Sequence, residues 1–212
     1  MRRSVYGMSV VWLCAAAVGY AAPQPAIVQA PSQWTAKVGV EPLRPITLRV
    51  GEQDHARRFW YTILRVENSM ARDVDFYPQA DLMTDTFELV PTGRAVPSDL
   101  CQIIKARHTG TYPLLEDLPF LGTKILQGRD HARDFAVIWP DFDPKAKAVK
   151  LFISGLSNET VVIDHPTARD QTGKPAKVFL RKTLQLDFAL QGESDLRGDE
   201  DIRFITSRWV MR

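Results

Sequence analysis

The chain has little cysteine. Its two cysteines among 212 residues are Cys14 and Cys101, and Cys14 lies in an N-terminal stretch with the features of a cleavable signal segment. A single remaining thiol cannot form an internal disulfide, so the fold must be held together by its hydrophobic core. We therefore predict that Cys101 is a small buried residue rather than a reactive thiol.

An excess of charge of one sign is also absent. The sequence has 27 Lys and Arg against 25 Asp and Glu, and two of the basic residues, Arg2 and Arg3, belong to the N-terminal stretch. The rest of the chain therefore has no net charge. Because a basic face supplies most of the affinity for nucleic acid, we expect that the protein does not bind nucleic acid.

The N-terminus lacks a hydrophobic run long enough to cross a bilayer comfortably. The apolar stretch Met8–Val18 follows two arginines and is shorter than the roughly 20 residues of a membrane span. Small residues before a cut after Ala21 complete the pattern of a secretory signal. We predict a signal peptide over residues 1–21, a flexible linker over 22–33 and a single domain over 34–212, exported to the periplasm or cell envelope. The alternative is an uncleaved N-terminal helix that anchors the protein to the membrane.

Familiar catalytic and metal-binding motifs are missing as well. The sequence has no HExxH, GxSxG or GxGxxG pattern, no phosphate-binding P-loop and no cysteine cluster. Their absence excludes several enzyme classes but not every enzyme. We predict no catalytic residues, no metal ligands and no cofactor.

Alternating apolar and polar residues dominate what is present. This period of two is typical of half-buried antiparallel strands. A single segment, about Asp99–His108, has apolar residues at helical spacing, with Ser98 placed to cap it and Gly110 to close it. Strands are expected at Ala36–Val40, Ile46–Val50, Arg58–Asn68, Val74–Leu82, Thr86–Val90, Lys124–Gln127, Asp134–Trp139, Ala148–Gly155, Thr160–Asp164, Lys177–Leu190 and Ile202–Met211. These elements predict an all-β sandwich with one short inserted helix.

The strand at residues 58–68 presents two different faces. Its even positions, including Trp60, are apolar or β-branched to the end and are assigned to the core. We expect the strand to pair as a hairpin with the segment that begins at Val74. The other face would then leave Phe59, Tyr61, Ile63 and Tyr77 as a candidate interaction surface, which either a partner or the predicted helix at Asp99–His108 could cover.

Four short segments carry candidate chemistry, and each also has an ordinary structural interpretation. Asp141 and Asp143 could share a calcium ion, although Asp before proline is a common turn. His131 lies between Asp130 and Asp134 and could act as a base, but a solvated charged loop between two strands is the preferred interpretation. Asp164 and His165 point to opposite sides of a strand, which Pro166 would end. Asn158 begins an Asn-x-Thr glycosylation sequon that also fits a hairpin turn.

Several phrases resemble a known group of proteins. The stretch VENSMARDVDFYPQADLMTDTFEL, with TKILQG, IWPDFDPKAKAVKLFISGLSNETVVIDHP and KVFLRKTLQLDF, resembles a family of uncharacterised exported proteins of planctomycete bacteria. The phrase RVENSMARDVDFYP is also similar to a hairpin of extracellular immunoglobulin-like domains. The resemblance implies an immunoglobulin-like antiparallel sandwich and brings no known activity.

Two functions remain from the sequence. The first is a non-enzymatic binding or structural module of the cell envelope, whose partner is an unknown protein or envelope component. The second is a metal-dependent or hydrolytic envelope enzyme that uses Asp141 and Asp143 or the region of His131.

Overall fold

The computed structural model describes residues 23–26, 30, 32–50, 55–118 and 122–212. The elements are β1 (Lys37–Val40), β2 (Arg44–Val50), β3 (His55–Glu67), β4 (Val74–Phe76), β5 (Gln79–Thr84), β6 (Leu89–Pro91), α1 (Leu100–His108), β7 (Glu116–Asp117), β8 (Thr123–Ile125), β9 (Arg133–Pro140), β10 (Ala148–Ser154), β11 (Thr160–Arg169), β12 (Pro175–Leu190) and β13 (Ile202–Met211), with short 3-10 turns at Arg129–His131, Ser194–Leu196 and Asp199–Asp201. The predicted signal segment, 1–21, lies outside the described residues.

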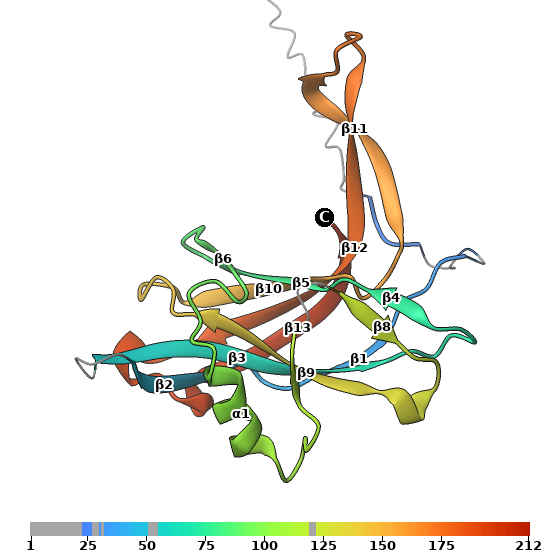
Figure 1. Cartoon of the computed structure of the whole chain (residues 1–212). Helices are drawn as coiled ribbons and strands as arrows, with labels where there is room; N and C mark the ends of the chain where they lie inside the picture. Colours follow the sequence, from blue (N-terminus) through green and yellow to red (C-terminus); the bar gives the residue numbers. More distant parts are fainter. Residues whose placement is uncertain (1–22, 27–29, 31, 51–54, 119–121) are drawn as a thin grey trace, which may run out of the picture.

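Two sheets pack face to face (Figure 1). The five-stranded sheet has the order β1-β3-β9-β7, with β2 also paired to β3. The six-stranded sheet has the order β11-β12-β10-β5-β6, with β13 also paired to β12. The main core fills the space between the sheets and includes Trp60, Trp139 and Phe188. The prediction of an all-β antiparallel sandwich with one short helix is confirmed.

The predicted hairpin between residues 58–68 and the segment from Val74 is wrong. β3 pairs with β1 and β2 on one side and with β9 on the other, so neither edge of it is open to β4. β4 pairs with β8, and β5 pairs with β10 in the opposite sheet. The predicted core side of the strand is nevertheless correct, because Trp60 is fully buried between the sheets.

Helix α1 covers the outer face of the five-stranded sheet (Figure 1). Phe59, Tyr61 and Ile63 are 0–1% exposed beneath it and form a second core with helix residues such as Ile104. The sequence prediction that these three side chains form an interaction surface is therefore wrong. Tyr77, the fourth member, is 64% exposed and lies away from them, since Ile63 pairs with Ala136.

The helix itself begins one residue later than predicted. Its N-terminal cap is Asp99 rather than Ser98, and no side chain caps it. The thiol of Cys101 is buried under the helix, and this burial, with the Asp117 charge, raises its pKa to about 11. A thiol with such a pKa stays protonated and unreactive, as a small buried residue should.

A two-stranded ribbon rises from the six-stranded sheet and projects far from the sandwich (Figure 1). We call residues 160–181 of this ribbon, formed by β11 and the first part of β12, the arm. β11 continues beyond the predicted end at Asp164 to Arg169, with an irregularity in register between these residues. Pro166 does not end the strand: it lies in the irregular stretch between Asp164 and Arg169, on an edge strand, where proline is tolerated.

Candidate functional site

The arm has apolar side chains on both faces. Val162 pairs across the ribbon with Phe179, and these two are 49% and 67% exposed. The opposite face has a half-buried set: Val161, Ile163, Val178 and Leu180. Within the described residues, β11 pairs only with β12, and residues 175–180 of β12 pair only with β11. An isolated two-stranded ribbon is marginally stable in water, so these apolar faces and free edges are suited to contact with a partner.

The sequence contains a signal for this surface that pattern reading missed. The runs VVI at 161–163 and VFL at 178–180 are apolar at consecutive positions, which in a strand places apolar side chains on both faces. Both runs flank a polar turn, so a ribbon with two apolar faces could have been predicted. That the ribbon would project from the body could not.

A buried ion pair holds the root of the arm. Lys182 lies on the core face of β12, and its Nζ is 2.9 Å from Oε2 of Glu159. The two side chains are only 7% and 2% exposed, and the ammonium also lies over the ring of Trp209. This ion pair explains why a charged residue, Lys182, stands on the otherwise apolar side of β12.

The carboxylate of Glu159 is kept ionised by its neighbours. Burial raises the pKa of Glu159, but hydrogen bonds from Ala26 N and Lys182 Nζ, together with the Lys182 charge, outweigh it and lower the pKa below the ordinary value. The Ala26 N–H donates to Oε1 at 2.6 Å. The charged form of the carboxylate therefore links the arm root to the N-terminal segment.

The loop between β10 and β11, residues 155–159, carries Glu159 and also binds the described part of the N-terminal segment. Oδ1 of Asn158 accepts a hydrogen bond from Trp34 N at 2.7 Å, and its Nδ2 donates to the Ser32 carbonyl at 3.0 Å. The hydroxyl of Ser157 donates to the Trp34 carbonyl. The asparagine of the predicted sequon thus holds the chain that precedes the sandwich.

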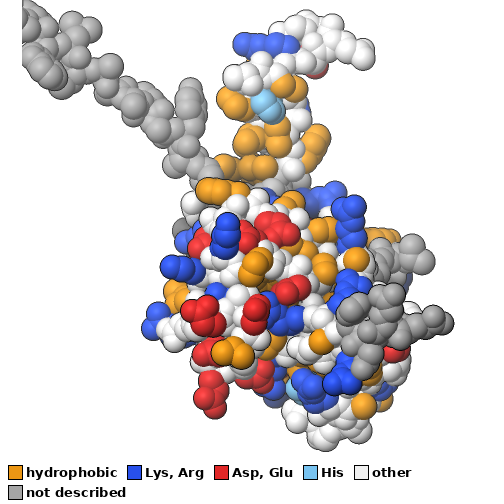
Figure 2. All heavy atoms as spheres, turned by 90° about the vertical axis from the view of Figure 1, so that its left-hand side faces the viewer, with side chains coloured by type: hydrophobic (Ala, Val, Ile, Leu, Met, Phe, Trp, Pro, Cys, Tyr) orange, Lys and Arg blue, Asp and Glu red, His pale blue; other side chains and the backbone are white. Residues whose placement is uncertain are grey.

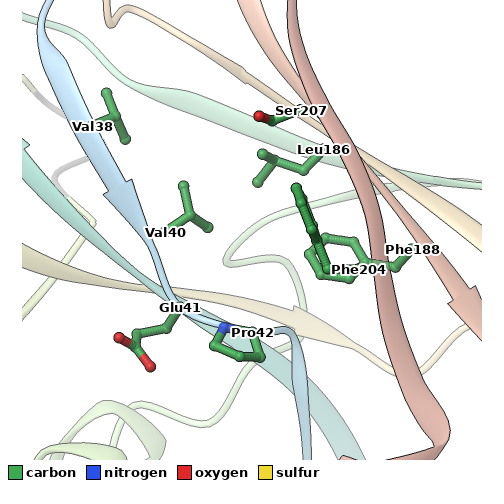
Figure 3. Close-up of a pocket in the computed structure, with 8 residues that line it drawn as sticks. All are labelled: Val38, Val40, Glu41, Pro42, Leu186, Phe188, Phe204 and Ser207. Atoms are coloured by element: carbon green, nitrogen blue, oxygen red, sulfur yellow. The ribbon is translucent and has the colours of Figure 1, made fainter.

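A second apolar surface lies at an open side of the sandwich, between β1 and the pair β12 and β13 (Figure 3). This β1–β13 cleft has a volume of about 360 Å³, and Phe204 in its wall is 52% exposed. Figure 3 shows the hydrophobic side chains turned toward one another across the gap while Glu41 points away. The lining consists of Val38, Val40, Glu41, Pro42, Leu186, Phe188, Phe204 and Ser207.

An acidic loop borders this cleft. Residues 191–201 contain five Asp and Glu but only one Arg. Figure 2 shows Asp and Glu side chains gathered on one face of the sandwich. Arg44 lies 3.6 Å from Glu41 of the cleft and 3.9 Å from Asp199 of the loop, so it joins the two. Leu196 in the same loop is 82% exposed.

The carboxylates Asp141 and Asp143 have separate structural roles. Asp141 accepts hydrogen bonds from Arg58 Nε at 3.0 Å and Nη2 at 3.1 Å and from the Trp60 indole at 2.7 Å. Asp143 accepts a hydrogen bond from the Lys145 backbone within its own turn, which lowers its pKa. Their hydrogen bonds fit the turn interpretation of this segment.

The predicted histidine positions do not join these carboxylates. His131 precedes β9 and Asp141 follows it, which separates them by the length of an eight-residue strand, about 26 Å. Asp134 pairs instead with Arg65 at 3.4 Å. In the arm, Nδ1 of His165 accepts hydrogen bonds from two following backbone N–H groups. Over the described ranges, no group of three or more His, Cys, Asp and Glu could hold a metal ion.

One further histidine lies in a polar cluster beside α1. Nε2 of His108 is 3.0 Å from the Tyr61 hydroxyl. Burial, with the charges of Arg44 and Arg107, lowers the pKa of His108. Tyr112 donates a hydrogen bond to Glu41 at 2.5 Å. The cluster attaches the end of the helix to the sandwich.

No helix among the described residues is long and apolar enough to span a membrane. Comparisons with protein-family models, with curated proteins and with solved structures found no match.

Proposed function

We propose that this protein is an exported, non-enzymatic binding module of the cell envelope and that the arm is its binding element. The observation that carries the proposal is a projecting ribbon with Val162 and Phe179 exposed on one face and, among the residues that the structure describes, no further strand on either backbone edge. Aromatic and aliphatic side chains on an accessible element are typical anchors of protein interfaces. The partner is a protein or another envelope component.

The anchoring of the arm also supports this function. A binding element works best when its root is rigid, because less conformational freedom is then lost on binding. The Lys182–Glu159 pair and the segment at Ala26 fix the root of the arm to the sandwich. The resemblance to exported bacterial proteins agrees with a location outside the cytoplasm, and the exported chain is expected to begin at Ala22.

Site-specific photo-crosslinking in the producing cells tests this function. A photoreactive phenylalanine analogue at Phe179 is expected to give a discrete crosslinked species, since this side chain would lie in the interface. The control position is Phe87, which is 87% exposed on the turn between β5 and β6 and is remote from the arm in sequence. Absence of a species specific to position 179, in cells where the protein is exported and folded, would contradict the function.

A further inference from the structure

The arm and the β1–β13 cleft are complementary in polarity. The arm presents exposed Val162 and Phe179, and the cleft has an apolar lining in which Phe204 is half exposed. A cleft of about 360 Å³ lies within the size range of protein pockets, and it can take a large side chain. Each surface leaves apolar area in water that the other could cover.

The backbone at the cleft is equally suited to a ribbon. In the part of the chain that the structure describes, β1 pairs only with β3, and β13 pairs only with β12. The cleft is therefore flanked by two edge strands whose outer backbone groups are available. An extended segment can add to such an edge by main-chain hydrogen bonds while its side chains enter the apolar gap.

The arm and the acidic loop are opposite in charge, while β13 on the other side of the loop carries Arg203 and Arg208, of which Arg208 is paired with Asp187. Residues 160–181 contain four Lys and Arg and two Asp, a net charge of +2 that the ion pair of Asp164 with Lys177 leaves unchanged. The loop at 191–201, which borders the cleft, contains five acids and one Arg. Within the described residues, Nη1 of Arg197 in this loop is buried without a hydrogen-bond partner. Opposite charges favour encounter of the two surfaces and select their relative orientation.

The two surfaces cannot meet within one molecule. β12 carries both Phe179 of the arm and Leu186 of the cleft lining, and the seven residue steps between them hold the two side chains about 23 Å apart along one strand. We propose that the arm of one copy of this chain docks in the β1–β13 cleft of a second copy. This inference rests on the proposed function, because it names the partner that the arm binds. The contact is head to tail, so each copy keeps one free arm and one free cleft, and assembly continues until a ring closes or a chain grows.

Charge reversal on the full exported chain tests the inference by sedimentation velocity and light scattering. The arm variant carries Lys177→Glu and Arg181→Glu, and the loop variant carries Glu193→Lys and Asp195→Lys. The wild type is expected to associate with a concentration dependence that weakens as salt is raised. Each variant alone should associate at least about tenfold more weakly, because like charges then face each other.

Mixtures of the variants give the decisive result. In an equimolar mixture, the basic arm of the loop variant meets the acidic loop of the arm variant, and the acidic arm of the arm variant meets the basic loop of the loop variant, so alternating association should return to the wild-type level. A chain that carries all four reversals should associate again as the wild type does. Unchanged circular dichroism and melting temperature show that each variant is folded.

Two results would overturn the inference: a wild type that stays monomeric at high concentration, or association that neither charge reversal affects. The crosslinking at position 179 separates the two proposals. A crosslink to a second copy supports both, a crosslink only to a different protein overturns the head-to-tail contact and preserves the binding function, and no crosslink contradicts the function itself.

Discussion

Replacement of Glu159 by Gln is expected to destabilise the protein by about 3 kcal/mol. Removing one partner of a buried ion pair typically costs about 3–5 kcal/mol, because the other charge is left without compensation. Both side chains here are more than nine-tenths buried. The lower end of the range applies because the single amide oxygen of glutamine can still accept one of the two hydrogen bonds, from Lys182 Nζ or from Ala26 N.

Urea unfolding followed by tryptophan fluorescence measures this loss. A domain of this size should melt roughly 2–4 °C lower for each kcal/mol, so the melting temperature should fall by about 6–12 °C. The matched control is Asp164→Asn, which removes an ion pair with Lys177 whose side chains are 58% and 61% exposed. Because exposed pairs contribute at most about 1 kcal/mol, the control should stay close to the wild type.

The double variant Glu159→Leu with Lys182→Met refines the test, since replacing both charges by apolar groups should recover most of the stability.

The ionisation of Glu159 should also make stability depend on pH. Its pKa is lowered in the folded state, so its contribution is present above the unfolded pKa and disappears as the pH falls through the folded pKa. A Glu159→Gln variant as stable as the wild type at pH 7 would refute the role assigned to the ion pair.

Three further outcomes are expected. Asp141→Ala should cost about 1–3 kcal/mol in urea unfolding, because it leaves a buried indole N–H without its acceptor, whereas Asp143→Ala should change stability little. Because the pKa of His108 is lowered in the folded state, the unfolded chain binds the proton more readily, and the wild type should lose stability as the pH falls below about 6.5. The stability of His108→Gln should decline less steeply with pH. An unchanged decline would contradict this role of His108. Ile104→Ala should cost about 2–5 kcal/mol and expose the sheet to a hydrophobic dye, whereas the more exposed Ile103→Ala should do neither.

The positions of the strands follow from local alternation, and so the sequence predicts them well. Burial of Trp60 and the long strand that ends at Leu190 are examples. The pairing of β3 depends on distant segments, and no local pattern shows that β9 would occupy its second edge. A local signal for the covered outer face was present, because residues 59–64 contain apolar side chains at both odd and even positions. Such a run is typical of a strand that is covered on both sides.

The candidate site was harder to predict because its contacts join residues far apart in the sequence. Glu159 and Lys182 come together only because the arm folds back on itself, and Ala26 is 133 residues from the carboxylate that it contacts. The predicted surface at Phe59, Tyr61 and Ile63 was wrong because an amphipathic helix later in the chain covers it. The apolar run at residues 59–64 indicates that both faces are covered, but it does not show which later element supplies the cover.

The attachment of the segment at Ala26 and of Arg212 near the arm root has a mechanical consequence. Ala26 contacts the loop that carries Glu159, and the backbone of Arg212 pairs with that of Arg181 at the base of the arm. Tension applied to the chain at Ala26 would therefore reach the arm root before it reached the sheets. Loading of a docked arm would pull on the same few hydrogen bonds and the single ion pair. Under force, this junction is expected to yield first, while the sandwich stays folded.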